Sequence, residues 1–305
     1  MNESNGESAP LTSVKVLLSG AIDYAGLFPP SGISMPEAVI NYATYKNSNY
    51  NWMLGRFIVA AAQLGEFYES ARDFISRDSG DVWRVSAVAG GNIFNVIDEI
   101  REFNEKYGPG VICDQLEVKA TSSEFIEDSA EALPSNIAAY FELAIDEGFA
   151  DMVATLALTE QRAKIRTGGV TADAFPKTSE IVKFVKTCLG AGVPFKATAG
   201  LHHPIRCFRP LTYENNSPEA TMHGFLNLFL MTGFAREGYR SGFLEDVMEE
   251  EFEEVFKFND QAVIWRDEFK LNVRGLERMR ETAIQSFGSC SFDEPIADLR
   301  KLGIL

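Results

Sequence analysis

Short runs rich in β-branched and aromatic residues alternate with longer amphipathic segments along the whole chain, and this alternation predicts a parallel α/β protein. Eight runs have the composition of strands, and a length of 305 residues suits eight βα units in one domain. These observations predict a (β/α)8 barrel, the TIM-barrel architecture. The predicted strands cover residues 23–28, 56–63, 84–89, 115–120, 138–145, 163–167, 194–199 and 255–258.

Helical periodicity fills the intervals between these strands. The clearest helix covers residues 178–191: it begins at Thr178-Ser179, continues through apolar residues at helical spacing and is ended by Gly190-Ala-Gly192. An extra helix over residues 11–21 precedes the first strand, and a capping box of Ser291 and Glu294 opens a C-terminal helix that extends to residue 302. We expect residues 1–10 to be disordered and residues 11–305 to form a single barrel domain. The other predicted helices are 35–45, 66–76, 92–107, 149–158 and 223–236.

Composition restricts the partners of the protein. The 44 acidic and 28 basic residues give a net charge of −16, which disfavours nucleic acids and anionic membrane surfaces. The four cysteines form no CxxC pair, which favours a reducing compartment. We find neither a secretory leader nor an apolar stretch of about 20 residues, so we expect a cytoplasmic protein. The Phe-rich composition permits a homo-oligomer.

Two lysines thirty-two residues apart lie on the sixth and seventh predicted strands, and each is followed closely by glycine. Alternation along a strand places Lys164 and Arg166 on one face, and likewise Lys196 and Thr198. If these faces point inward, they meet Glu117 and Glu142 at the carboxyl ends of the strands, where barrel enzymes hold their active sites. A lysine that is partly desolvated beside another cation has a lowered pKa and can attack a carbonyl group.

These residues resemble those of a known family. The segment Lys-Ile-Arg-Thr-Gly at 164–168 is similar to the sixth-strand Lys-Thr-Ser-Thr-Gly of deoxyribose-phosphate aldolases, and Lys-Ala-Thr-Ala-Gly at 196–200 is similar to their seventh-strand Lys-Ala-Ala-Gly-Gly. The resemblance implies a class I aldolase in which Lys164 forms a Schiff base and Lys196 lowers its pKa. The sequence departs from this family in two places. It has Glu117 where those aldolases carry an aspartate, and its predicted eighth strand lacks their phosphate-binding signature.

The three histidines of the chain offer an alternative chemistry, since all of them lie between residues 202 and 223. His202 and His203 follow the seventh strand, and His223 begins a helix, so one of the adjacent pair can share a metal site with His223 and an acid. A metal-dependent hydrolase or isomerase is therefore the main alternative to the aldolase. A non-catalytic barrel that binds an anionic small molecule is the third.

Further polar residues surround the predicted mouth of the barrel. Asp23 and Tyr24 lie at the first strand, where they either contact a ligand or hold the loop in place. The glycines at 168, 169 and 200 either offer backbone N–H groups to an anion or simply form turns. The polar segment 205–220 is a candidate lid, whereas the turn at residues 288–291 is expected to lie away from the mouth.

The sequence thus predicts a carbon–carbon lyase of aldolase type that acts on a small anionic or carbonyl-containing metabolite and needs neither a metal ion nor an organic cofactor. The predicted catalytic residues are Lys164, Lys196, Glu142, His202 and His203. The predicted substrate-binding residues are Asp23, Tyr24, Glu117, Arg166, Thr167, Gly168, Gly169, Thr198 and Gly200.

Overall fold

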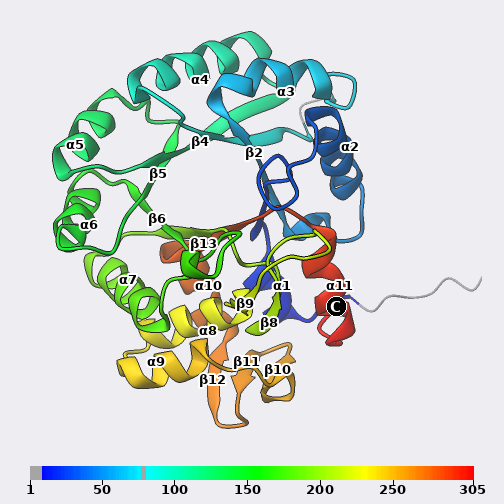
Figure 1. The fold of residues 1–305 in the computed structure, drawn as a ribbon, viewed down its shortest axis with the longest axis vertical. Coiled ribbons are helices and arrows are strands. Elements are labelled where there is room, and N and C mark those ends of the chain that lie inside the picture. Colours follow the sequence, from blue (N-terminus) through cyan, green and yellow to red (C-terminus); the bar gives the residue numbers. More distant parts are fainter. Residues whose placement is uncertain (1–8, 77–79) are drawn as a thin grey trace, which may run out of the picture.

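Eight parallel strands form a closed barrel with helices outside it, so the predicted (β/α)8 fold is confirmed (Figure 1). The computed structural model describes residues 9–76 and 80–305, and most of the predicted N-terminal tail lies outside them. Around the barrel the strands follow chain order. They are β1 (Ile22–Tyr24), β2 (Leu54–Ala60), β3 (Trp83–Val88), β4 (Val111–Lys119), β5 (Ala138–Glu142), β6 (Arg162–Arg166), β7 (Phe195–Thr198) and β13 (Ile284–Ser289).

The helices surround the barrel and bury their apolar faces against the strands (Figure 1). In α4 the side chain of Asn92 caps the first turn by accepting from the N–H of Phe94, and apolar residues at helical spacing cover strand β4. The helices are α1 (Thr12–Leu18), α2 (Met35–Lys46), α3 (Leu64–Ala71), α4 (Ile93–Tyr107), α5 (Ser123–Ala132), α6 (Phe149–Leu158), α7 (Thr178–Ala191), α8 (Phe225–Arg236), α9 (Ser241–Met248), α10 (Val273–Thr282) and α11 (Asp293–Lys301). Within the described part of the chain, none of them has the length and apolar character needed to cross a bilayer.

The eighth barrel strand is not the predicted one. The predicted run at 255–258 forms β10 (Phe256–Asn259), which pairs antiparallel with β11 (Ala262–Trp265), and β11 pairs with β12 (Phe269–Asn272). This small sheet lies outside the barrel, beside α9 (Figure 1). The true eighth strand, β13, pairs with both β7 and β1 and closes the barrel. Its inward residues include Ser286 and Gly288, so it carries a weak apolar signal.

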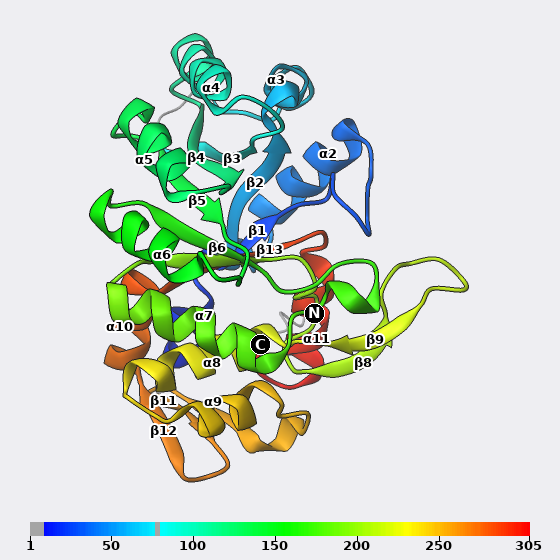
Figure 2. The same cartoon turned by 60° about the vertical axis from the view of Figure 1, so that its left-hand side comes forward.

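The polar segment 205–220 contains a β-hairpin rather than an irregular loop. Strand β8 (Cys207–Pro210) pairs antiparallel with β9 (Glu219–Met222), and the hairpin projects beside α11 (Figure 2). It follows β7 along the chain, on the side of the barrel where the carboxyl ends of the strands lie. This hairpin therefore covers part of the face on which barrel enzymes bind their substrates.

Candidate functional site

A cavity of about 350 Å³ opens at the carboxyl ends of the barrel strands. Its lining comes from both the strands and the loops that follow them, which is the usual position of an active site in this fold. Six of its polar or reactive residues are Glu117, Lys164, Arg166, Thr198, His202 and Cys290. The structure thus places several of the predicted site residues together, and it adds a cysteine that the sequence interpretation had placed away from the mouth.

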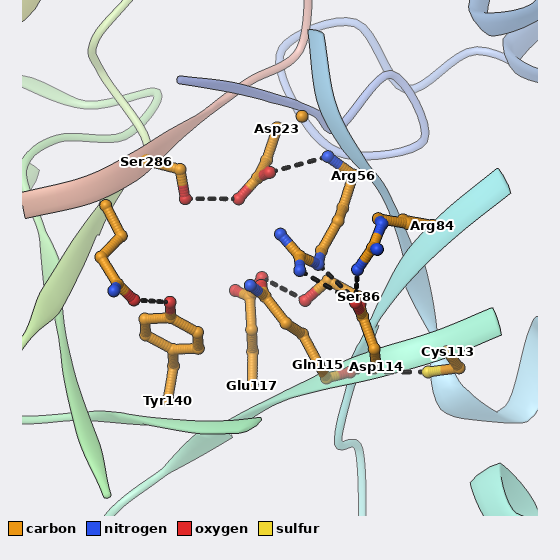
Figure 3. A network of polar contacts seen from close by, with 12 residues as sticks. Asp23, Arg56, Arg84, Ser86, Cys113, Asp114, Gln115, Glu117, Tyr140 and Ser286 are labelled. Atoms are coloured by element: carbon orange, nitrogen blue, oxygen red, sulfur yellow. Dashed lines mark hydrogen bonds and ion pairs between the residues drawn. The ribbon is translucent and has the colours of Figure 1, made fainter. Parts of the chain in front are cut away.

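A network of buried ion pairs lies beneath this cavity. Lys196 is fully buried, and its Nζ is 2.8 Å from Oδ2 of Asp23 and 2.6 Å from Oε1 of Glu117. Ser286 donates a hydrogen bond to Asp23, and Ser86 donates one to Glu117 (Figure 3). Each of these charges is therefore compensated inside the barrel, as burial of an ionised group requires.

Glu117 connects the two lysines of the predicted aldolase motif. Its Oε1 pairs with Lys196, and its Oε2 lies 2.8 Å from Nζ of Lys164. Burial alone would raise the pKa of the Glu117 carboxyl group, but the two ammonium groups outweigh it and hold this pKa well below its usual range. The predicted mechanism required the two ammonium groups to lie next to each other. In the structure the Glu117 carboxylate lies between them instead.

Lys196 cannot act as predicted. Burial alone would lower the pKa of Lys196, but the carboxylates of Asp23 and Glu117 outweigh burial and raise it. Its ammonium group also lies 5.1 Å from the centre of the Tyr140 ring, so its neighbours enclose it on several sides. Lys196 therefore keeps its proton and remains out of contact with the cavity, which makes it a structural cation.

Lys164 lines the cavity, but two carboxylates hold its amine. Glu117 is at 2.8 Å and Glu142 at 2.9 Å from Nζ, and Glu142 also lies 3.5 Å from Nε of the half-exposed Arg166. Although burial opposes ionisation of Glu142, Lys164 and Arg166 lower the pKa of its carboxyl group. The predicted acid/base Glu142 is therefore an ion-paired carboxylate, and two carboxylates engage Nζ of Lys164.

The glycine turns after β6 and β7 pack mainly against each other. A Cβ atom on Gly168 would lie 2.8 Å from the Cα of Gly200 and 2.5 Å from the Phe175 ring, and Gly200 has a φ of +75°. Thr167 is buried and donates to the carbonyl oxygen of Ala199 at 2.7 Å, which ties the two strand ends together. Turn formation thus explains these residues, while Gly169 and Thr198 do border the cavity.

Asp23 and Tyr24 are core residues. Besides its contacts with Lys196 and Ser286, Asp23 accepts a hydrogen bond from the backbone N–H of Arg56. The Tyr24 ring is buried in an aromatic cluster that includes Tyr45, and its hydroxyl group lies 3.4 Å from Nδ2 of Asn41. Of the two predicted roles, ligand contact and holding the loop in place, these contacts favour the second for Asp23 and Tyr24.

The three histidines do not converge. His203 Nδ1 lies 2.6 Å from Asp298 of α11, and His223 Nε2 lies 2.9 Å from the carbonyl oxygen of Pro176. In the portion of the chain that the structure describes, no group of three or more His, Cys, Asp or Glu residues has the arrangement of a metal site. The predicted histidine metal centre is therefore wrong, and His202 is the histidine that borders the mouth cavity.

His202 contacts a cysteine and a glutamate that lie far from it in the sequence. Its Nδ1 is 3.7 Å from Sγ of Cys290, directly after β13, and 3.5 Å from Oε2 of Glu294 in α11. The hydroxyl group of Tyr213, at the end of the hairpin, lies 3.7 Å from the same sulfur and donates to Glu294 at 3.3 Å. We call these four residues the thiol cluster.

The ionisable groups of the thiol cluster shift one another's pKa values. Burial alone would lower the pKa of His202, but Cys290 and Glu294 raise it to about 9. Burial alone would raise the pKa of the Cys290 thiol, but hydrogen bonds from His202, Tyr213 and Ser31, together with the charge of His202, lower it. The cluster therefore favours a thiolate paired with an imidazolium, the state in which a cysteine is a nucleophile.

The geometry of the cluster differs from that of a Ser-His-Asp triad. In a triad, the acid contacts the ring nitrogen opposite the nucleophile. Here Cys290 and Glu294 both approach Nδ1 of His202, so that a single N–H group faces two acceptors. Glu294 consequently stabilises the positive charge of the imidazolium without fixing its tautomer from the far side of the ring.

Comparisons with known proteins leave the family open. Neither the models of known protein families nor the curated proteins include a match to the chain. Among solved structures, the spore cortex-lytic enzyme SleL of Bacillus cereus is similar, with a TM-score of 0.41 and 13% identity over 94% of this chain and 74% of that one. A likeness at this level assigns no function.

The predicted aldolase function is a wrong prediction. Glu117 and Glu142 both pair with Nζ of Lys164. Lys196, which the prediction needed as a cation in direct contact with Lys164, is instead enclosed by carboxylates. The two motifs that resemble deoxyribose-phosphate aldolases are instead explained by the ion network and by the packing of two strand-end turns. The predicted histidine metal enzyme is wrong as well, since in the described residues the three histidines have separate partners. The anion-binding barrel stays a prediction.

Proposed function

We propose that the protein is a cysteine-dependent enzyme that transfers or hydrolyses the acyl group of a small carbonyl compound, with Cys290 as the nucleophile and His202 as the acid/base. One observation carries this proposal. Sγ of Cys290 lies 3.7 Å from Nδ1 of His202, and both residues border the cavity at the carboxyl ends of the barrel strands. A nucleophile within reach of a base, beside a cavity for the substrate, is the basic requirement of covalent catalysis.

The other three cysteines show how unusual the surroundings of Cys290 are. Burial raises the pKa of Cys113 to about 12 and that of the half-buried Cys207 to about 11, and it also raises the pKa of Cys188. Cys290 alone has a lowered pKa among the cysteines, although it is itself buried. The difference comes from hydrogen-bond donors and a positive charge, which are the features that activate catalytic cysteines.

The proposed reaction has two steps. The Cys290 thiolate attacks the carbonyl carbon, the bond to the leaving group breaks, and the His202 imidazolium gives its proton to that group. Water then attacks the thioester and gives a proton to His202, the carbon–sulfur bond breaks, and the carboxylic acid leaves as the thiolate is restored. If an alcohol, amine or thiol takes the place of water, the same steps transfer the acyl group.

Lys164 has a role in this reaction that differs from the predicted one. An ammonium group has three N–H donors, and the ion pairs with Glu117 and Glu142 account for two of them. We assign the third to the oxyanion that develops on the attacked carbonyl group, because Lys164 borders the same cavity as Cys290. Arg166, whose side chain is 55% exposed, is placed to bind an anionic part of the substrate.

The size of the cavity limits the substrate. A volume of about 350 Å³ lies near the lower end of the range of about 300–1,000 Å³ that is typical of small-molecule sites. We therefore expect a metabolite-sized ester, thioester or amide rather than a polymer.

Hydrolysis of a chromogenic ester, para-nitrophenyl acetate, tests the proposal. We expect Cys290→Ser to lower kcat/KM about a hundredfold or more, and Cys207→Ser, the matched control, to leave it unchanged. Intact mass spectrometry should find one acetyl group on Cys290 during turnover. Equal hydrolysis by the wild-type protein and Cys290→Ser would refute the proposal.

A further inference from the structure

A second cavity of about 230 Å³ lies under the β8–β9 hairpin, next to the thiol cluster. The hairpin, the start of α11 and the loop after β7 form its walls. Residues that border it include Arg209, Leu211, Met222, Tyr213, His202 and Glu294. We call it the hairpin cavity.

His202 separates the two cavities, since it borders both of them. Cys290 borders the mouth cavity, whereas Glu294 and Tyr213, which contact His202 or Cys290 directly, border the hairpin cavity. The nucleophile therefore faces one space, and the groups that surround the acid/base face the other. This arrangement suits a substrate that extends across the thiol cluster.

Resting on the proposed function, we propose that the hairpin cavity binds the leaving group of the substrate, and that this group is apolar and carries one anionic substituent recognised by Arg209. The leaving group must receive its proton from His202, so it has to lie within hydrogen-bond reach of the ring and needs a space that the ring borders. The hairpin cavity is the adjacent space that His202 borders.

The lining of the hairpin cavity defines the chemistry of its ligand. Leu211 and Met222 are buried apolar side chains, so they favour an apolar or aromatic group. Glu294 is already engaged with His202 and Tyr213. Arg209 is exposed and borders this cavity, where its side chain contacts the Cys207 thiol, and over the residues that the structure covers no carboxylate lies within 4.0 Å of its guanidinium nitrogens. Its charge can therefore bind an anion on the ligand.

Tyr213 marks the junction between the two spaces. Burial, followed by the nearby Cys290 and Glu294, raises the pKa of its phenol, so that the hydroxyl group stays protonated and donates hydrogen bonds. A substrate that spans the thiol cluster replaces this hydroxyl group beside the sulfur. The Tyr213 hydroxyl group then donates only to Glu294, with which it is already in contact.

Two esters test the inference in the 305-residue chain. One is para-nitrophenyl acetate, and the other is its analogue with a carboxylate on the nitrophenyl ring. We expect the wild-type protein to prefer the charged ester, and Arg209→Gln to lower kcat/KM for it about tenfold while leaving the neutral ester unchanged. Arg209 is exposed, so this substitution does not disturb the core. The exposed Arg240, at the start of α9, provides the matched control Arg240→Gln.

The outcomes separate this inference from the proposed function. If Arg209→Gln affects both esters equally or neither of them, while hydrolysis still depends on Cys290, the leaving-group assignment is wrong and the thiol mechanism stands. If Cys290→Ser hydrolyses both esters at the wild-type rate, both proposals are wrong. A selective loss for the charged ester in Arg209→Gln, absent in Arg240→Gln, supports the inference.

Discussion

The barrel holds two groups of charged residues a short way apart, and they differ in how completely their charges are neutralised. In the ion network beneath the cavity, Lys196 is fully buried between two carboxylates, and each of its partners has further hydrogen-bond donors. In the thiol cluster, a single imidazole N–H group faces both Cys290 and Glu294, and the cluster borders two cavities.

This contrast separates a structural charge from a reactive one. A buried lysine is noticeable in a sequence because burial of a charge is costly, but the cost is offset as readily by fixed carboxylates as by a catalytic use. Reactivity requires in addition a space for the substrate and a group that changes its protonation state. The thiol cluster meets both conditions, whereas the environment of Lys196 meets neither.

The largest effect should follow removal of the structural charge. Lys196→Ala leaves Asp23 and Glu117 buried without their cation, which should lower the free energy of unfolding by about 3–5 kcal/mol. Urea denaturation followed by circular dichroism measures this loss. A loss below about 1 kcal/mol would show that the network does not stabilise the barrel.

An exposed ion pair provides the control for this experiment. Lys257 and Asp267 are 2.5 Å apart, but their side chains are 52% and 73% exposed. Because solvent screens such pairs, Lys257→Ala should change the stability by about 0–1 kcal/mol. A similar loss in both variants would mean that the burial of Lys196 adds nothing.

The next effect concerns the reactivity of Cys290. Replacement of His202 by Asn removes the positive charge and the hydrogen bond that lower the pKa of the thiol. We expect the rate of Cys290 alkylation by iodoacetamide at pH 7 to fall about tenfold or more, because a smaller fraction of the sulfur is thiolate. An unchanged rate would exclude His202 as the activating group.

Predictions from the sequence were most accurate where packing alone determines the structure. The first seven predicted strands overlap β1 to β7, and the helices at 149–158 and 178–191 have the predicted bounds. The eighth strand was missed because Ser286 and Gly288 face the interior and leave β13 with few apolar residues, while the run at 255–258 has a typical strand composition. The apolar pattern of a sequence therefore fails to predict a barrel strand whose inward residues are polar or small.

The same error concealed the thiol cluster. Since β13 was not recognised, Cys290 was assigned to a turn away from the mouth, although a residue directly after a barrel strand lies at the catalytic face. The partners of Cys290 come from segments 77 and 88 residues away, and no local motif links them. Conversely, Lys164 and Lys196 were found correctly as inward residues, but the carboxylates that neutralise them come from other strands.

A smaller effect is expected in the titration of His202. Its folded pKa of about 9 lies above its ordinary value of 6.5, so the stability that it contributes is fully present below pH 6.5 and is lost as the pH rises through about 9. Glu294→Gln should move the midpoint of the His202 titration downward, because it removes one of the two groups that raise the pKa. With only three histidines in the chain, NMR can follow each imidazole separately.

His223 serves as the internal control in that titration. Burial lowers its pKa, and its partner is a backbone carbonyl oxygen rather than an acid. Its midpoint should lie below 6.5 and should not move in Glu294→Gln. If His202 titrates near its ordinary value in the wild-type protein, the imidazolium–thiolate pair does not form.

Competitive alkylation of the four cysteines tests the central claim most directly. The folded protein would be treated with a limiting amount of iodoacetamide at pH 7, and the labelled peptides would be identified by mass spectrometry. We predict that Cys290 is modified before the more exposed Cys207, because its thiol has a lowered pKa whereas the pKa of Cys207 is raised to about 11. Modification of Cys207 first, or of both at equal rates, would contradict the assignment of Cys290 as the nucleophile.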